Sequence, residues 1–266
     1  AKFVQFMLNN GATDSLSSLS KIVEKMEIPE STPAAQLGLK TGYAKGITVD
    51  YLNYKFPFYL HGGTSIGFFS KYAYNRDLKV GFIVCGSNPN EIADILLHFF
   101  TDSLPTPQPI PTISVSSEVL KSYEGYYQLK SPRFELLDKY LEELLHGYHI
   151  ELRGDSLYAY GFKRPDQAIL PVTSTIFKKP NETLASFLFT TNQEGNKVLY
   201  DWGAYYEKTS YTKILLIRIL VLGSLICGVL LLLSSIFWLF KAIFKKLSWK
   251  EYFTRSLSAY GVITLI

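Results

Sequence analysis

Apolar residues recur with three different spacings along the chain, and each spacing predicts a different kind of structure. In residues 1–10 and 89–100 they follow the helical period of about 3.6 residues. Between residues 46 and 85, and again after Tyr123, short apolar and aromatic runs alternate with polar or glycine-containing turns, which indicates antiparallel strands. From Ile219 to Phe240 the apolar run is continuous and uncharged. The pattern predicts a mixed α+β chain followed by a membrane-spanning segment.

The first hundred residues predict three helices and four strands. The first helix covers residues 1–10 and ends at Gly11, a glycine cap. The other helices are predicted at Ser18–Met26 and Pro89–Phe100, where the proline suits the first turn. Residues 34–46 are predicted as turn and loop. Strands are expected at Gly46–Tyr51, Phe56–Leu60, Ile66–Tyr74 and Lys79–Cys85. We expect an antiparallel sheet flanked by helices.

Prolines at alternate positions in residues 104–113 favour an extended, semi-rigid linker, and we place a domain boundary there. Beyond it, residues 118–210 predict a small antiparallel β unit. Ile150–Tyr160 reads as a hairpin, because Gly154 and Asp155 suit a two-residue turn. Residues 134–145 have helical periodicity, and further strands are expected at Tyr123–Tyr127, Ala168–Val172, Ser186–Thr190 and Lys197–Trp202. No convergent polar set appears in this unit, so we interpret it as a packing and spacer module.

The uncharged run Ile219–Phe240 holds about twenty-two residues, enough to cross a hydrocarbon core of about 30 Å at about 1.5 Å per residue. A soluble core helix is rarely apolar on every face over this length. Aromatic residues expected at the two membrane surfaces are Tyr205, Tyr206 and Tyr211 before the run and Trp238 and Trp249 after it. More basic residues follow the run than precede it. Those that follow are Lys241, Lys245, Lys246, Lys250 and Arg255, and those that precede are Lys208, Lys213 and Arg218. This difference predicts that the C-terminal side of the run is cytoplasmic. A second apolar helix begins at about Leu257.

Composition narrows the possible functions. Of the 266 residues, 47% are hydrophobic and 15% aromatic, with the excess after Lys213, and the net charge is +4. The basic residues are spread along the chain, so we expect no nucleic-acid partner. The two cysteines, Cys85 in a strand expected to be buried and Cys227 in the apolar run, are not expected to pair. The four histidines lack metal-ligand spacing, so no metal site and no cofactor is predicted: His61, His98, His146 and His149.

The segment Tyr59–Phe69 carries the candidate chemistry. His61, Gly62 and Gly63 lie between residues that favour extended backbone, and paired glycines in such a run mark a bend or a close approach by backbone or ligand. One interpretation is a strand edge that serves as a substrate wall beside an imidazole. The other is a tight turn between strands with His61 exposed.

In its context this segment resembles the third motif of the serine β-lactamase and penicillin-binding-protein family, in the branch where Lys-Thr-Gly becomes His-x-Gly. Upstream, Met7–Gly11 closing a helix and Gly38–Gly46 resemble the family's approach to the motif. Downstream, Phe68–Tyr74, the Asn75–Asp77 turn and Lys79–Asn88 resemble its next two strands. The resemblance covers residues 1–104, the C-terminal part of such a domain, and the β unit after the linker is similar to the lipocalin-like accessory domains of some members.

The resemblance implies acyl transfer, in which a serine activated by a lysine and a tyrosine attacks an amide, β-lactam or ester carbonyl. In that scheme the backbone N–H of Thr64 donates to the oxyanion. His61 holds an acidic group of the substrate when protonated or joins the proton network when neutral. Gly62 and Gly63 let the substrate lie against the strand. The resemblance thus implies catalytic roles for His61 and Thr64. It implies substrate binding by His61, Gly62, Gly63 and Thr64.

The family's first two motifs, Ser-x-x-Lys and Tyr-x-Asn, are matched by letter at Ser18–Lys21 and Tyr51–Asn53. In the family these motifs lie far apart, in a helical region well before the third motif, so we interpret both matches as coincidental. The chain also begins at Ala1 within a helical pattern. We therefore expect the nucleophile in sequence that precedes Ala1.

The sequence as a whole predicts a membrane-anchored serine hydrolase with its hydrolase and β domains outside the cytoplasm. The expected divisions are residues 1–104, the linker 105–117, the β domain 118–210 and the membrane region 211–266. Expected partners are the lipid bilayer and a small-molecule or cell-wall peptide substrate. One alternative is a catalytically inactive binding or signalling module at the cell surface. Another is a transporter-linked β domain, which requires further spanning helices after Ile266.

Overall fold

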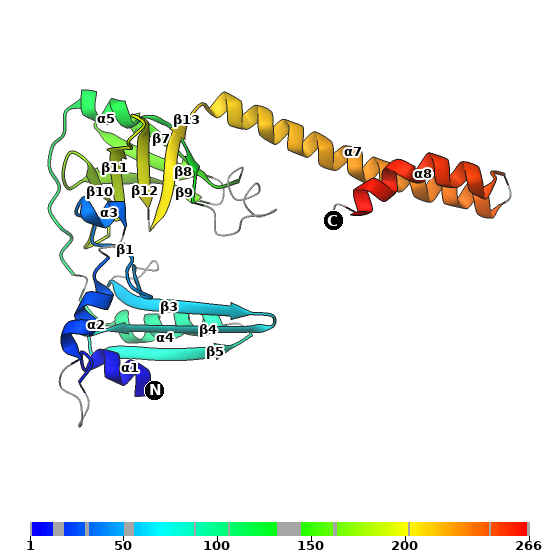
Figure 1. Ribbon diagram of the computed structural model, residues 1–266. Coiled ribbons are helices and arrows are strands. Elements are labelled where there is room, and N and C mark those ends of the chain that lie inside the picture. Colours follow the sequence, from blue (N-terminus) through cyan, green and yellow to red (C-terminus); the bar gives the residue numbers. More distant parts are fainter. Residues whose placement is uncertain are drawn as a thin grey trace. The chain divides into compact units, whose positions relative to one another are not determined.

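The computed structural model describes residues 2–12, 19–29, 32–50, 56–87, 89–105, 107–131, 145–161, 164–201, 203–244 and 246–264. These residues form two compact units, Ala1–Thr209 and Ser210–Ile266 (Figure 1). The first unit contains a five-stranded sheet and a closed β-barrel, and the second contains two helices. The expected mixture of helices and antiparallel sheets is therefore confirmed.

The five-stranded sheet is antiparallel and its strands follow one another in chain order. Two short strands, β1 (Gly42–Tyr43) and β2 (Thr48–Asp50), lead into the long strands β3 (Phe58–Ser65), β4 (Phe68–Asn75) and β5 (Val80–Gly86). His61 lies opposite Tyr72, and Tyr72 lies opposite Ile83. Because side chains alternate between the faces of a strand, this register fixes the face on which each candidate residue lies.

Helices cover the two faces of this sheet unequally. Helix α4 (Pro89–Thr101) packs Ala93 and Leu97 against one face, where the cluster includes Phe58, Leu60, Ala73, Phe82 and Val84. Helices α1 (Lys2–Leu8) and α2 (Ser20–Glu27) cover part of the other face with Val4, Met7 and Val23 around Tyr74. Gly81 allows α1 to approach, since an added Cβ would lie 2.4 Å from Val4 Cγ1. At the far end of this second face Ile83 and Cys85 remain exposed.

An ion pair between the buried Glu27 and the partly buried Arg76 ties α1 and α2 to the turn after β4. The Arg76 guanidinium donates to both carboxylate oxygens of Glu27 at 2.5 Å, and its Nε donates to the Met7 carbonyl at 2.9 Å. The hydroxyl of Tyr74 donates to the same carboxylate. Burial, and then the bond to Glu27, raise the pKa of Tyr74, so its hydroxyl stays a donor. Removing one partner leaves the other charge uncompensated.

The barrel follows residues 107–116 and helix α5 (Ser117–Tyr123). Its strands are β6 (Gly125–Leu129), β7 (Gly147–Arg153), β8 (Ser156–Gly161), β9 (Arg164–Pro171), β10 (Ile176–Lys178), β11 (Phe187–Thr191), β12 (Lys197–Asp201) and β13 (Ala204–Thr209). Neighbouring strands are antiparallel, and β13 pairs with β6 to close the ring. The expected small antiparallel β unit is thus confirmed as a closed barrel.

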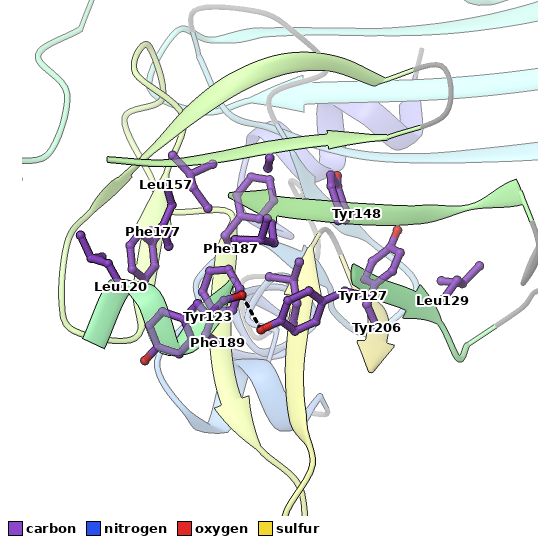
Figure 2. Packing of buried hydrophobic residues seen from close by; sticks show 14 residues of the cluster. Leu120, Tyr123, Tyr127, Leu129, Tyr148, Leu157, Phe177, Phe187, Phe189 and Tyr206 are labelled. Carbon is purple, nitrogen blue, oxygen red and sulfur yellow. Dashed lines mark hydrogen bonds between the residues drawn. The ribbon is translucent and has the colours of Figure 1, made fainter. Parts of the chain in front are cut away.

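Aromatic side chains fill the barrel interior (Figure 2). Tyr123 stacks on Phe189 with ring centroids 4.4 Å apart, and the Tyr127 hydroxyl donates to the Tyr123 carbonyl at 2.9 Å. Through Leu120 and Tyr123, α5 contributes to the same core. Each large side chain that is fully buried contributes about 1.5–3 kcal/mol, so the barrel is stabilised mainly by this cluster.

A charged group lies within the barrel wall. Arg164 donates to Asp201 Oδ2 at 3.1 Å and to the Tyr206 hydroxyl at 2.8 Å, and it lies 4.1 Å above the Tyr148 ring. The Tyr148 hydroxyl also donates to Asp201. Burial raises the pKa of the Asp201 carboxyl, and the nearby Arg164 only partly opposes this.

The segment around helix α3 (Pro33–Gln36) packs on the outside of the barrel. Ala34 and Leu39 form a buried cluster with barrel residues Leu188, Val198 and Tyr200. The Thr41 hydroxyl donates to the Ala185 carbonyl at 2.7 Å. The polypeptide that enters the sheet at β1 is therefore fixed to the barrel as well.

The second unit consists of α7 (Tyr211–Ile243) and α8 (Trp249–Thr264). Among the described residues α7 is the one helix long and apolar enough to cross a membrane, and most of its large apolar side chains are exposed. The two helices contact each other, and the Arg255 guanidinium lies 4.5 Å above the Trp238 ring. Helix α7 starts eight residues before the predicted Ile219, and α8 starts before the predicted Leu257.

Several sequence predictions are wrong in detail. Strand β3 continues through Gly62 and Gly63 to Ser65, so the glycines are not a turn; the turn lies at Ile66 and Gly67, where Gly67 has a φ of +74°. Cys85 is exposed rather than buried, because no helix among the described residues covers its end of the sheet face. Tyr205 and Tyr206 belong to β13, with Tyr206 buried in the barrel core, and are not a membrane belt. Strands β1, β10 and β13 and the short helices α3 and α5 were not anticipated.

Two groups of predictions lie outside the described residues. They are the helical periodicity of residues 134–144 and the letter matches at Ser18 and Tyr51–Asn53. The division into a hydrolase part, a linker and a β domain stays a prediction, since both parts fall within the unit Ala1–Thr209.

Removing the carboxylate of Glu27 should strongly destabilise the protein. Glu27→Ala leaves the partly buried Arg76 guanidinium and the buried Tyr74 hydroxyl without their acceptor, and we expect a loss of about 3 kcal/mol in the free energy of unfolding. The exposed pair Glu151 and Arg153 provides the control, where Glu151→Ala should cost much less because solvent screens the pair. Denaturant unfolding of both variants in detergent, followed by tyrosine fluorescence, measures the difference. Equal losses of unfolding free energy in the two variants would contradict the stabilising role assigned to Glu27.

The buried carboxyl of Asp201 should make stability depend on pH in a defined direction. Because its pKa is raised in the folded protein, the folded state binds the proton more tightly than the unfolded state. The resulting stabilisation is fully present below the ordinary aspartate pKa of about 4 and is lost as pH rises through the higher folded value. Asp201→Asn should remove this component, whereas Asp155→Asn in an exposed turn should retain it. Unfolding midpoints measured across pH for the three proteins test the sign.

Candidate active site

His61 lies in the middle of β3 with an aromatic side chain on each side. The Tyr43 hydroxyl is 3.1 Å from His61 Nε2, and the two rings meet edge to face with centroids 5.9 Å apart. On the neighbouring strand Tyr72 lies nearly parallel to the imidazole at 6.5 Å. The His61 side chain is partly exposed, so the imidazole is held in place and still reachable from solvent.

Beyond this histidine, one edge of β3 is open. Strand β2 pairs with β3 only over Phe58–Leu60, whereas β4 pairs with β3 over the seven residues Tyr59–Ser65. Within the part of the chain that the structure describes, His61–Ser65 therefore has a strand partner on one side only. Unpaired backbone groups at such an edge can bond to an extended ligand or to a developing oxyanion.

The two glycines make this edge flat. Neither has a positive φ, so both adopt ordinary strand backbone. A Cβ on Gly63 would lie 3.0 Å from Ser70 Oγ, and one on Gly62 would lie 3.4 Å from the Ser70 carbonyl oxygen. Both residues are exposed. What glycine provides here is therefore an unobstructed surface rather than an unusual backbone conformation.

The predicted site residues divide between the two faces of the sheet. His61 and Gly63 share the face of Tyr72 and Cys85, while Gly62 and Thr64 lie on the face covered by α4. All four residues border the open edge of β3. A ligand at that edge reaches the imidazole from one face and the backbone of Thr64 along the strand.

Tyr43 and Tyr72 are site residues that the sequence analysis missed. Burial, and then the proximity of Tyr43, raise the pKa of Tyr72, so that its hydroxyl is protonated and donates to the Gly46 carbonyl at 3.4 Å. The alternation of β4 places Tyr72 opposite His61 once the register is known. Tyr43 gave no signal, because its segment was predicted as loop.

The described parts of the chain contain no group of three or more histidine, cysteine or acidic residues able to hold a metal ion. His98 pairs with Asp102 at 3.1 Å on α4, and His149 stacks on Tyr160 at 5.0 Å on the barrel. These histidines lie on separate elements from His61. The arrangement at β3 consists of an imidazole, two tyrosine hydroxyls and an open strand edge.

Comparison with known proteins does not identify a family for this chain. No family model and no curated protein matches the chain. Among solved structures, it is similar to an octameric penicillin-binding protein homologue from Pyrococcus abyssi, with 18% identity and a TM-score of 0.30 over 78% of this chain and 45% of the other. It is also similar to SurE with D-Leu, with 12% identity and a TM-score of 0.35 over 79% and 47%. The chain spans less than half of each solved chain, and at TM-scores below 0.5 neither likeness establishes a common fold.

Proposed function

We propose that this chain supplies the sheet side of the active site of a membrane-anchored serine hydrolase of the β-lactamase and penicillin-binding-protein type. The observation that carries the proposal is the open edge of β3 at His61–Ser65, a flat strand with an imidazole at its start. The sequence resemblance at His61, Gly62 and Gly63 assigns the same edge to substrate binding. The acyl-accepting serine and its base come from sequence outside these residues.

Each candidate residue has a role that its position permits. Thr64, on the unpaired stretch, offers a backbone N–H to the oxyanion that forms when a carbonyl is attacked. Gly62 and Gly63 let an amide, β-lactam or ester lie close to the strand. His61 binds an acidic group of the substrate or takes part in proton transfer. No metal or cofactor is required for this acyl-transfer scheme.

The second unit provides the membrane anchor in this proposal. Helix α7 has 33 residues and a length of about 50 Å, more than the roughly 30 Å of a hydrocarbon core. The basic residues in its last turn and beyond it, Lys241, Lys246 and Arg255, support a cytoplasmic C-terminal end. The sheet and the barrel then lie outside the cytoplasm.

Acylation of the longer protein tests the catalytic proposal. The 266-residue chain should not react with a fluorescent penicillin or a fluorophosphonate, whereas a protein extended at its N-terminus should be acylated. In that protein His61→Ala should lower the acylation rate at least tenfold, about 1.4 kcal/mol, with little change in unfolding temperature because the side chain is partly exposed. His98→Ala, an exposed histidine on α4, is the control and should react at the wild-type rate.

Other outcomes of this experiment are equally informative. Wild-type acylation by a folded His61→Ala protein would remove His61 from the site. A longer protein that folds and is never acylated by either reagent would favour the inactive binding or signalling module.

Cysteine labelling tests the orientation of the anchor. Cys85 is exposed, so in a Cys227→Ala background an impermeant maleimide should label it on intact cells. A second variant, with Cys85→Ser and Ser248→Cys added to that background, should be labelled only after the membrane is permeabilised, since Ser248 follows α7 on the cytoplasmic side. Labelling of the second variant on intact cells would refute the orientation and the extracytoplasmic position of the site.

A further inference from the structure

The residue that contacts His61 through a hydrogen bond, Tyr43, is held in place from several sides. In β1, Gly42 pairs with Val49 and Tyr43 pairs with Thr48. Gly42 has a φ of +121°, a conformation that residues with a side chain rarely adopt. The backbone before Tyr43 is thus set by a glycine and by a strand partner.

The barrel adds a further support to the same residue. The Thr41 hydroxyl donates to the Ala185 carbonyl at 2.7 Å. On the other side, Gly203 in the turn between β12 and β13 lies next to Tyr43, where an added Cβ would be in ordinary van der Waals contact, 3.5 Å from the Tyr43 nitrogen. Two barrel segments therefore contact the three-residue stretch from Thr41 to Tyr43.

The contact to His61 uses one ring nitrogen only. The Tyr43 oxygen is 3.1 Å from Nε2, while Nδ1 has no hydrogen-bond partner among the described residues. A neutral imidazole has one nitrogen that donates and one that accepts, and the bond made by one nitrogen fixes the role of the other. The 3.1 Å contact is compatible with either direction of donation. A phenol O–H is a better donor than its oxygen is an acceptor, so donation from Tyr43 to Nε2 is the favoured direction, and it places the ring proton on Nδ1.

We propose that Tyr43, supported by the barrel, is a positioning residue that keeps neutral His61 in the tautomer protonated at Nδ1. That N–H is then the group that His61 presents to a substrate, and it fits a carbonyl or carboxylate oxygen of the substrate class proposed above. This inference rests on the proposed function for its catalytic meaning. The barrel accordingly contributes to the site as well as to stability.

Imidazole tautomers can be measured without any enzymatic reaction. The chain of 266 residues, labelled with ¹⁵N-histidine and reconstituted in lipid, has four histidines, and His61→Gln identifies the signals of His61 by their loss. At a pH where the ring is neutral, we expect Nδ1 to carry the proton. Tyr43→Phe removes only the hydroxyl and should give a mixture of both tautomers, with an unchanged unfolding temperature because Tyr43 is 45% exposed.

Two further variants test whether the effect on the His61 tautomer is specific to Tyr43 and its contact with the barrel. Tyr59→Phe removes a hydroxyl from the same sheet face, two residues from His61, and should leave the tautomer unchanged. Thr41→Val removes the bond to the barrel and should shift the tautomer in the direction of Tyr43→Phe.

The outcomes that overturn the inference are distinct from failure of the proposed function. A wild-type imidazole protonated at Nε2, or a Tyr43→Phe spectrum identical to wild type, would refute the role of Tyr43. A wild-type spectrum from Thr41→Val would refute the role of the barrel. If the spectra behave as expected and the longer protein is never acylated, the positioning stands and the hydrolase proposal is the one that fails.

Discussion

The register in which β3 pairs with β4 determines the sheet face on which each candidate residue of β3 lies. It places His61 opposite Tyr72 and Gly63 opposite Ser70 within a run of seven consecutive pairs. A shift by one residue would move His61 to the face that α4 covers and would bring Leu60 out to solvent. The tight turn at Ile66 and Gly67 and the buried cluster around Leu60 and Ala73 both oppose such a shift.

The face that carries His61 is itself held by charge and aromatic contacts. Glu27 and Arg76 lie at one end, with Tyr59 and Tyr74 stacked on each other at 5.3 Å and Arg76 within 6 Å of both rings. Tyr72 continues this row of rings toward His61. This face is thus tightly packed where α1 and α2 cover it and open where His61 and Cys85 lie. The imidazole is therefore accessible to solvent and lies next to a well-packed part of the sheet.

The sequence predicted the elements whose patterns are local and missed those that depend on distant partners. Alternation and turn residues were sufficient for β3, β4, β5 and the Gly154 hairpin, and an unbroken apolar run was sufficient for α7. Tyr43 could not be found in this way, because its position depends on barrel residues Gly203 and Ala185, which are far from it in the chain. Cys85 was misplaced for a related reason, since an apolar strand indicates burial without showing where the covering helix ends.

The closure of the barrel has a consequence for the order in which the chain folds. The three long strands of the first sheet pair with their immediate neighbours, so most of their contacts are local in sequence. The barrel closes when β13 pairs with β6, where Tyr126 lies opposite Thr209. This pairing brings together two segments that are separated in the sequence by all the other barrel strands, which costs loop-closure entropy. Contacts of such long separation slow folding. During synthesis the first sheet therefore has its strand partners well before the barrel does, and the barrel stays open until its last strand, directly before the apolar helix, has been made.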